Sequence, residues 1–153
     1  MAFDRRIIEA RLGLDLIGSS DMPKIAWDAL EAGLDGPAIR RLAALNSPTY
    51  FEVRDVLPEA LREMGLAGLS RAEAAFRIAK DLAQEILASG KDPLKLKHHF
   101  WQLWIKSGYA RELQSVGNLA DETYLASTIG GHSEDKIREW MNDRLEEFLD
   151  ERI

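Results

Sequence analysis

The chain has 153 residues, of which 46% are hydrophobic and 30% are charged, and it contains no cysteine. This composition excludes an intrinsically disordered chain and a disulfide-stabilised fold. A net charge of −6 argues against general nucleic-acid binding, because that activity needs clustered positive charge. No run of about 18 apolar residues occurs, and charges interrupt the N-terminal stretch. We therefore expect no membrane partner and no signal peptide, and we predict a cytoplasmic protein.

Apolar residues recur every three or four positions through the first half of the chain, which predicts helices. We expect a first helix over 3–17 and, after a Gly-Ser-Ser break, a second one with Pro23 in its first turn. A short third helix follows at once, and Asp35 is its expected N-cap. Thr49 opens a fourth helix, in which Pro58 predicts a kink or a break.

The second half of the chain has clear helix starts. Ser70 begins a capping box, and the helix after it should be the longest, over 71–89. Asp92 precedes a proline at the start of the next helix. Two short helices are expected between 109 and 131, where the pattern is weakest. Ser133 begins the last helix, which has acidic residues in its first turn.

Together these segments predict an all-α protein, because no run of residues alternates between apolar and polar side chains as a strand would. The length suits one domain. We predict a single all-helical domain over residues 1–153, an irregular bundle of seven or eight short helices packed around the helix at 71–89.

The stretch ALEAGLDGPAIRRLAAL at 29–45 has glycine, aspartate and proline at the positions of a tight helix corner. It resembles a helix–turn–helix segment of small uncharacterised bacterial helical proteins, in which a kinked helix like the one expected at 51–64 also follows. The resemblance covers residues 27–65. It implies a bacterial origin and an all-helical domain, and it implies no activity and no functional residue.

The segment 94–105 holds a candidate pocket formed by His98, His99, Trp101 and Trp104. Adjacent histidines point about 100° apart on a helix, so they suit one metal ion poorly, and we predict no metal site. Neighbouring lysines would fit a nucleic-acid surface, but the tryptophans continue an apolar stripe and are expected to be buried. The helix is apolar on most sides, which favours a central position and leaves a partner face or self-association face as the alternative.

The last predicted helix is strongly acidic, with eight acidic and three basic residues between 134 and 151. Such a pattern is typical of the solvated face of a packed helix. It also fits a surface for a basic partner, because complementary charge speeds association. The candidate partner-binding residues are Glu139, Asp143, Glu146, Glu147 and Asp150.

No serine, histidine or acidic residue has the sequence context of a known nucleophile or of an acid–base pair, so we predict no catalytic residue and no cofactor. Small size, acidity and the acidic last helix favour a non-enzymatic protein-binding module. An immunity protein that neutralises a basic toxin is one such module. Two alternatives stay open: a structural or adaptor protein that self-associates through 94–105, and a small-ligand-binding or enzymatic domain with its site near His98, His99 and Trp101.

Overall fold

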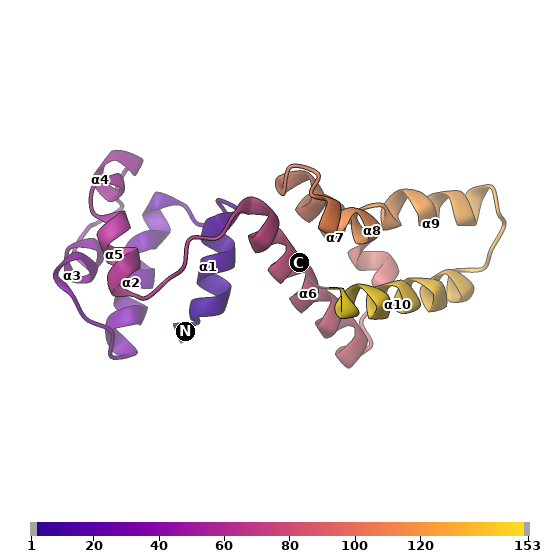
Figure 1. The fold of residues 1–153 in the computed structure, drawn as a ribbon, viewed down its shortest axis with the longest axis horizontal. Helices are drawn as coiled ribbons and strands as arrows, with labels where there is room; N and C mark the ends of the chain where they lie inside the picture. The colour runs from indigo at the N-terminus through magenta and orange to yellow at the C-terminus, as the bar shows by residue number, and fades with distance from the viewer. Residues whose placement is uncertain (1–2, 152–153) are drawn as a thin grey trace. The chain divides into compact units, whose positions relative to one another are not determined.

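The fold is described from a computed structural model over residues 3–151. Within this range it contains helices and no strand, which confirms the all-α class (Figure 1). Eight of the helices in the same range have seven residues or more. Residue contacts divide the chain into two compact units, Met1–Leu69 and Ser70–Ile153, and each is described by itself. That residues 1–153 form a single domain stays a prediction.

The first unit is built from short helices. Its elements are α1 (Arg5–Gly13), the 3₁₀ turn η1 (Ser19–Asp21), α2 (Met22–Glu31), α3 (Pro37–Ala43), α4 (Tyr50–Arg54) and α5 (Leu57–Glu63). The first helix is shorter than the predicted 3–17, because the chain turns into the left-handed region at Asp15, where φ is 55°. The expected break at Pro58 is confirmed, since α4 ends before it and Pro58 lies in the first turn of α5.

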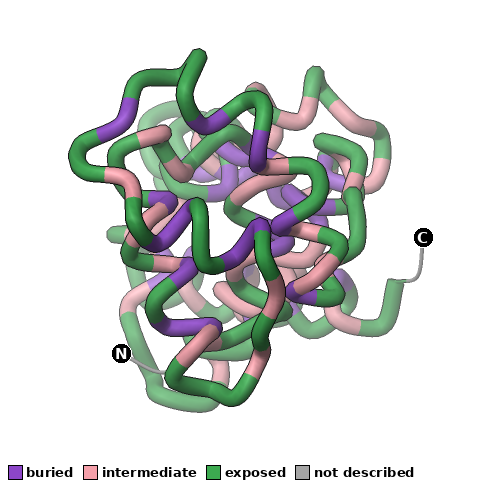
Figure 2. Tube along the Cα trace, turned by 90° about the vertical axis from the view of Figure 1, so that its left-hand side faces the viewer, coloured by how far each residue is buried: buried purple, intermediate pink, exposed green. Residues whose placement is uncertain are grey.

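The core of the first unit is aliphatic. Its buried cluster contains alanine, valine, leucine, isoleucine and methionine side chains from α2, α3, α4 and α5, and no buried aromatic ring. Figure 2 shows buried positions interspersed with exposed ones along the trace, as expected when each helix turns one stripe inward. The cluster members are Met22, Ala26, Ala29, Ala38, Ile39, Leu42, Ala43, Val53, Val56, Ala60 and Met64.

The start of α3 corrects one prediction, because Asp35 is not its N-cap. The cap position is Gly36, and Asp35 instead binds the Arg40 guanidinium, with contacts of 2.8 and 2.5 Å. The open N–H groups of Ala38 and Ile39 donate to the carboxylate of Glu63 on α5, at 3.3 and 2.9 Å. A carboxylate more than twenty residues away therefore caps this helix, which local sequence does not reveal.

The second unit contains the longer helices. Its elements are α6 (Arg71–Ser89), α7 (Pro93–Lys106), the 3₁₀ turn η2 (Arg111–Leu113), α8 (Gln114–Gly117), α9 (Leu119–Thr128) and α10 (Glu134–Asp150). The predicted caps are confirmed: the side chains of Ser70, Asp92 and Ser133 accept from backbone N–H groups in the first turns of α6, α7 and α10. The predicted bounds of the longest helix, 71–89, are confirmed as well.

The core of the second unit combines aliphatic side chains with three buried phenylalanine rings. Helix α10 packs on α6 and α7, and the rings of Phe76 and Phe148 meet edge to face with centroids 5.4 Å apart. The ammonium group of Lys80 lies over both rings, at 4.9 and 4.8 Å from their centroids. It also donates to the carbonyls of Phe148 and Glu151, at the C-terminal end of α10. Burial lowers the pKa of Lys80, against the opposing effect of the nearby Glu151 carboxylate.

The face of α7 that enters the core differs from the predicted one. Phe100 and Leu103 are buried, whereas Trp101, expected in the apolar stripe, is 41% exposed. Trp104 is half-buried and passes so close to α8 that a Cβ added at Gly117 would lie 2.6 Å from its indole. The spacing of Phe100 and Leu103 therefore marks the buried stripe, and the ring at 101 lies outside it.

Among the described residues, no helix combines the length and the apolar character that crossing a bilayer requires.

Candidate functional site

The four predicted pocket residues on α7 line neither of the two cavities described below. His98, His99 and Trp101 are exposed, and Trp104 packs edge to face against Tyr109 with ring centroids 5.2 Å apart. A ligand site formed by them stays a prediction.

Four of the five predicted acidic residues lie on one face of α10. Glu139, Asp143, Glu146 and Asp150 follow at intervals of four, three and four residues, which keeps them on the same side of a helix. All four are exposed, as is Glu147 beside them. Within the described chain, Glu139, Asp143 and Glu146 form no ion pair. We call the four residues the acidic stripe.

The arginines of α10, in contrast, are held by carboxylates of the same unit. Arg138 donates to both carboxylate oxygens of Asp92, at 3.0 and 3.2 Å, and also binds Glu134 and Asp135. Hydrogen bonding to this guanidinium lowers the pKa of Asp92 below its ordinary value of 3.8. The charge of both arginines is thereby turned toward their own unit, whereas Lys136, three residues before Glu139, is exposed on the same helix.

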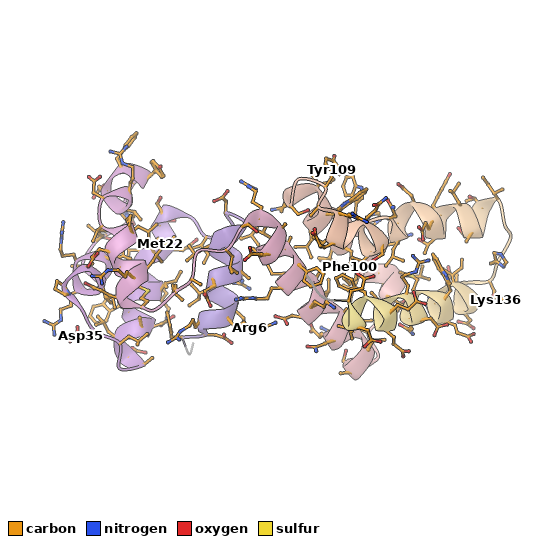
Figure 3. All side chains as sticks on the ribbon, in the orientation of Figure 1. Arg6, Met22, Asp35, Phe100, Tyr109 and Lys136 are labelled. Carbon is orange, nitrogen blue, oxygen red and sulfur yellow. The ribbon has the colours of Figure 1, made fainter. Side chains whose placement is uncertain are left out.

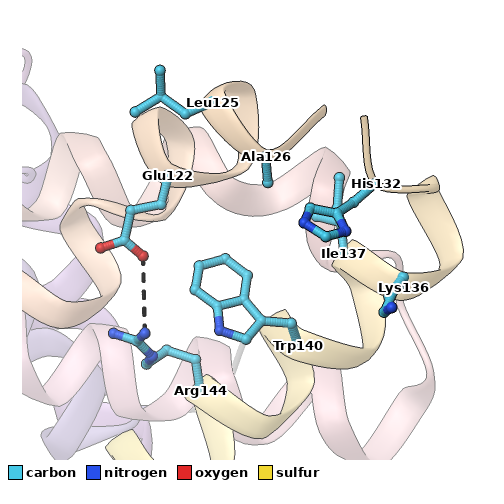
Figure 4. Close-up of a pocket in the computed structure, with 8 residues that line it drawn as sticks. All are labelled: Glu122, Leu125, Ala126, His132, Lys136, Ile137, Trp140 and Arg144. Atoms are coloured by element: carbon cyan, nitrogen blue, oxygen red, sulfur yellow. Dashed lines mark ion pairs between the residues drawn. The ribbon is translucent and has the colours of Figure 1, made fainter. Parts of the chain in front are cut away.

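A groove of about 550 Å³ lies between α9 and α10, which run in opposite directions and are joined by the turn at 129–133 (Figures 1 and 4). Its walls are apolar, with Leu125 and Ala126 on α9 and Ile137 and Trp140 on α10. The remaining lining residues carry polar or charged groups at its ends: Glu122, His132, Lys136 and Arg144. Figure 3 places Lys136 near the start of α10.

Backbone hydrogen bonds close the turn between the two helices. The N–H groups of Ile129 and Gly130 donate to the carbonyl of Leu125, at 3.0 and 3.1 Å, and that of His132 donates to Ala126 at 3.1 Å. A Cβ at Gly130 would lie 2.9 Å from the Ala126 carbonyl oxygen, so only glycine fits there without a shift. This turn places the His132 ring at one end of the groove (Figure 4).

A charged pair lies at the other end of the groove. Arg144 Nη2 and Glu122 Oε2 are 4.0 Å apart, and the guanidinium lies 5.2 Å from the centre of the Trp140 ring. The Glu122 side chain is 37% exposed, but its Oε2 atom is buried and accepts no hydrogen bond. A buried carboxylate oxygen without a donor is costly, so a bound donor at this end would be stabilised.

The sequence did not reveal this groove. Leu125 and Ile129 belong to the apolar pattern of α9, yet their side chains are 50% and 80% exposed. Tyr124 is exposed as well. The sequence did contain one indication of the groove: α9 has more apolar residues than a single buried stripe can accommodate. Its buried face is formed by Leu119 and Thr123 alone, which leaves the larger apolar side chains without a cover.

A second cavity, of about 340 Å³, lies beside the Asp92–Arg138 ion pair, which is part of its lining. Within residues 3–151, no three His, Asp or Glu side chains lie close enough to hold a metal ion together. Comparison of the chain with protein-family models, with curated proteins and with solved structures gives no match.

Proposed function

We propose that the chain is a non-enzymatic protein-binding module that captures a basic protein. The observation that carries this proposal is the division of charge on α10. Its arginines bind carboxylates of the same unit, while Glu139, Asp143 and Glu146 face solvent and have no ion pair among the described residues. Such a one-sided field steers a positively charged partner toward the helix.

Capture of a basic toxin domain, as an immunity protein performs it, is the specific form of this function that the acidity of the chain favours. A cytoplasmic location is part of that proposal. The support is chemical: the stripe offers four carboxylates spaced over about 16 Å of helix, which matches a row of lysines or arginines on a partner.

The proposal is tested with a variant that neutralises the stripe, E139Q/D143N/E146Q/D150N. Tagged wild type and variant are used to capture proteins from a lysate of the source cells, over a series of salt concentrations, and captured proteins are identified by mass spectrometry. The expected result is a dominant basic partner that elutes as salt rises and is absent from the variant.

A matched control keeps the change in net charge but moves it elsewhere. The variant E31Q/D55N/E59Q/E85Q neutralises four exposed acidic residues outside α10. It should capture the partner as the wild type does. A partner lost equally from both variants would show that only net charge matters, and the absence of any captured partner at low salt would overturn the proposed function.

A second candidate function is self-association through α7, which the exposure of Trp101 favours. This helix carries the exposed lysines Lys95 and Lys106, whose positive charge complements the acidic stripe of another copy. Light scattering over a concentration series tests it. The molar mass measured by light scattering should rise with concentration for the wild type. For Trp101→Ser it should stay at the value of the monomer.

A further inference from the structure

We infer that the groove between α9 and α10 receives an amphipathic helix of the basic partner, an inference that rests on the proposed function. The apolar stripe of that helix would lie between the walls formed by Leu125 and Trp140. Lysine or arginine side chains along its flank would face the acidic rim of the groove.

The shape of the groove favours a helix over a small ligand. Its apolar wall extends beyond the cavity along α9, because Ile129 follows Leu125 by one turn and is 80% exposed. A small ligand inside about 550 Å³ would leave this side chain in water. An extended apolar partner covers both residues, and a helix presents apolar side chains at the same one-turn spacing.

The rim of the groove determines the charge of the occupant. Asp143 and Glu147 lie three and seven residues after Trp140, so both flank the side of α10 that carries this ring, and both are exposed. On the facing helix, Asp121 is exposed one residue before Glu122. Together with Glu122, these three carboxylates outnumber the two basic lining residues, Lys136 and Arg144, so the surroundings of the groove complement an apolar stripe flanked by basic residues.

The buried end of the groove supports the same occupant. Glu122 Oε2 accepts no hydrogen bond and has only the guanidinium of Arg144, 4.0 Å away, as an ion partner. A lysine or arginine from the partner would supply the missing donor. At the opposite end, Lys136 makes the groove less favourable for positive charge, so the basic residues should gather toward Asp143.

The test uses three synthetic peptides of about 18 residues, long enough to form several helical turns. The first is amphipathic and basic, with leucine at helical spacing and lysine elsewhere. The second has the same leucine positions with glutamate in place of lysine, and the third has the composition of the first in scrambled order. Binding is measured by fluorescence anisotropy of labelled peptide against the full-length protein.

The inference predicts that the amphipathic basic peptide binds at least about tenfold more tightly than either of the other two. The variant L125S/I129S should weaken this binding by about tenfold or more, because it removes the apolar wall. Tyr124→Ser is the matched control, since Tyr124 is equally exposed on α9 but does not line the groove. It should change binding less than about twofold.

Two charge variants at the groove give opposite expectations. Lys136→Glu should strengthen binding of the basic peptide and Asp143→Lys should weaken it, each by about three- to tenfold in affinity. Circular dichroism checks that each variant folds, and Leu125→Ser alone replaces the double variant if that one unfolds. Heteronuclear NMR shifts confined to α9 and α10 would locate the peptide in the groove.

Other outcomes overturn the inference. Equal binding of the scrambled peptide means that charge alone acts, and equal or tighter binding of the acidic peptide means that the rim does not select. Concentration-dependent dimerisation that L125S/I129S abolishes assigns the groove to a second copy of the chain. If no peptide binds while neutralising the stripe still abolishes capture from lysate, the proposed function stands and the groove has no part in it.

Discussion

The two units of the molecule use their carboxylates differently. In Met1–Leu69, Glu63 accepts hydrogen bonds from two N–H groups of α3, and Glu9 accepts from the N–H of Ala67 at 2.6 Å. In Ser70–Ile153 the long helices carry their own caps, and the acidic stripe of α10 faces solvent. The net charge of the two units is the same, so the difference lies in where the carboxylates are placed. Placement, rather than amount, makes an acidic residue structural or available to a partner.

The hydrophobic cores of the two units differ in whether they bury aromatic rings. The first unit has an aliphatic core, and its aromatic rings Trp27, Tyr50 and Phe51 are exposed. The second unit buries Phe76, Phe100 and Phe148. Loss of one of these rings should destabilise the fold more than loss of one aliphatic side chain from the first core, because a larger cavity remains.

The largest effect that would sharpen this contrast is expected for Phe148→Ala. It removes a fully buried ring, its edge contact with Phe76 and one of the two rings under Lys80, and should cost about 3–5 kcal/mol of unfolding free energy. Urea denaturation measures the loss. Phe51→Ala, at an exposed ring, is the control and should cost no more than about 0.5 kcal/mol. Equal losses of unfolding free energy in the two variants would contradict the expected difference between the two units.

A smaller loss is expected for Glu63→Ala, which leaves the N–H groups of Ala38 and Ile39 without their acceptor. The expected cost is about 2 kcal/mol, as for loss of a charged cap. Thermal unfolding measures it. Glu59→Ala, on the same helix, removes only an exposed ion pair with Arg62 and should cost clearly less. Equal melting temperatures of the two variants would show that the hydrogen bonds of Glu63 stabilise the fold no more than an exposed ion pair does.

The next effect in size is the dependence of the unfolding free energy on pH that Asp92 causes. Because Arg138 lowers its pKa in the folded state, Asp92 stabilises the fold above its ordinary pKa of 3.8. That stability is lost as pH falls through the lower folded pKa. Asp92→Asn keeps an acceptor for the Leu94 N–H but removes the charge. It should therefore lower stability at neutral pH and flatten the acid side of the stability–pH curve, measured by urea unfolding between about pH 2 and 7.

The smallest effect on stability is expected for E139Q/D143N/E146Q/D150N. These side chains are exposed, so the unfolding free energy should change by no more than about 0.5 kcal/mol. Removal of like charges from one helix face favours a small gain over a loss. Chemical denaturation of the variant beside the wild type measures it. A loss of several kcal/mol would mean that the stripe, like Glu63, serves the fold.

Much of the fold could be predicted because the caps are local. Ser70, Asp92 and Ser133 each act within three residues of their own position, and the helices they begin match the expected ones. The cap of α3 could not be predicted, because Glu63 lies on another helix and meets Ala38 only after folding. Local pattern favours the nearest acceptor, Asp35, which the structure instead pairs with Arg40.

The candidate site was only half predictable for a related reason. The exposed carboxylates of the stripe follow from their helical spacing and composition, which are local properties. The groove could not be predicted in this way, because its wall residues Leu125 and Trp140 have the residue types of a core. Whether an apolar side chain is buried depends on which element covers it, and the covering element is a property of the tertiary packing.

The turn at 129–133 has a consequence for kinetics. Its three backbone hydrogen bonds fix the separation of α9 and α10 before any partner arrives, so binding needs no prior ordering of the groove walls. For a docked basic helix, the association rate would then follow the encounter frequency and fall with ionic strength, whereas residence time would follow the apolar contacts. Gly130 would thus affect how fast such a complex forms without contacting the docked helix.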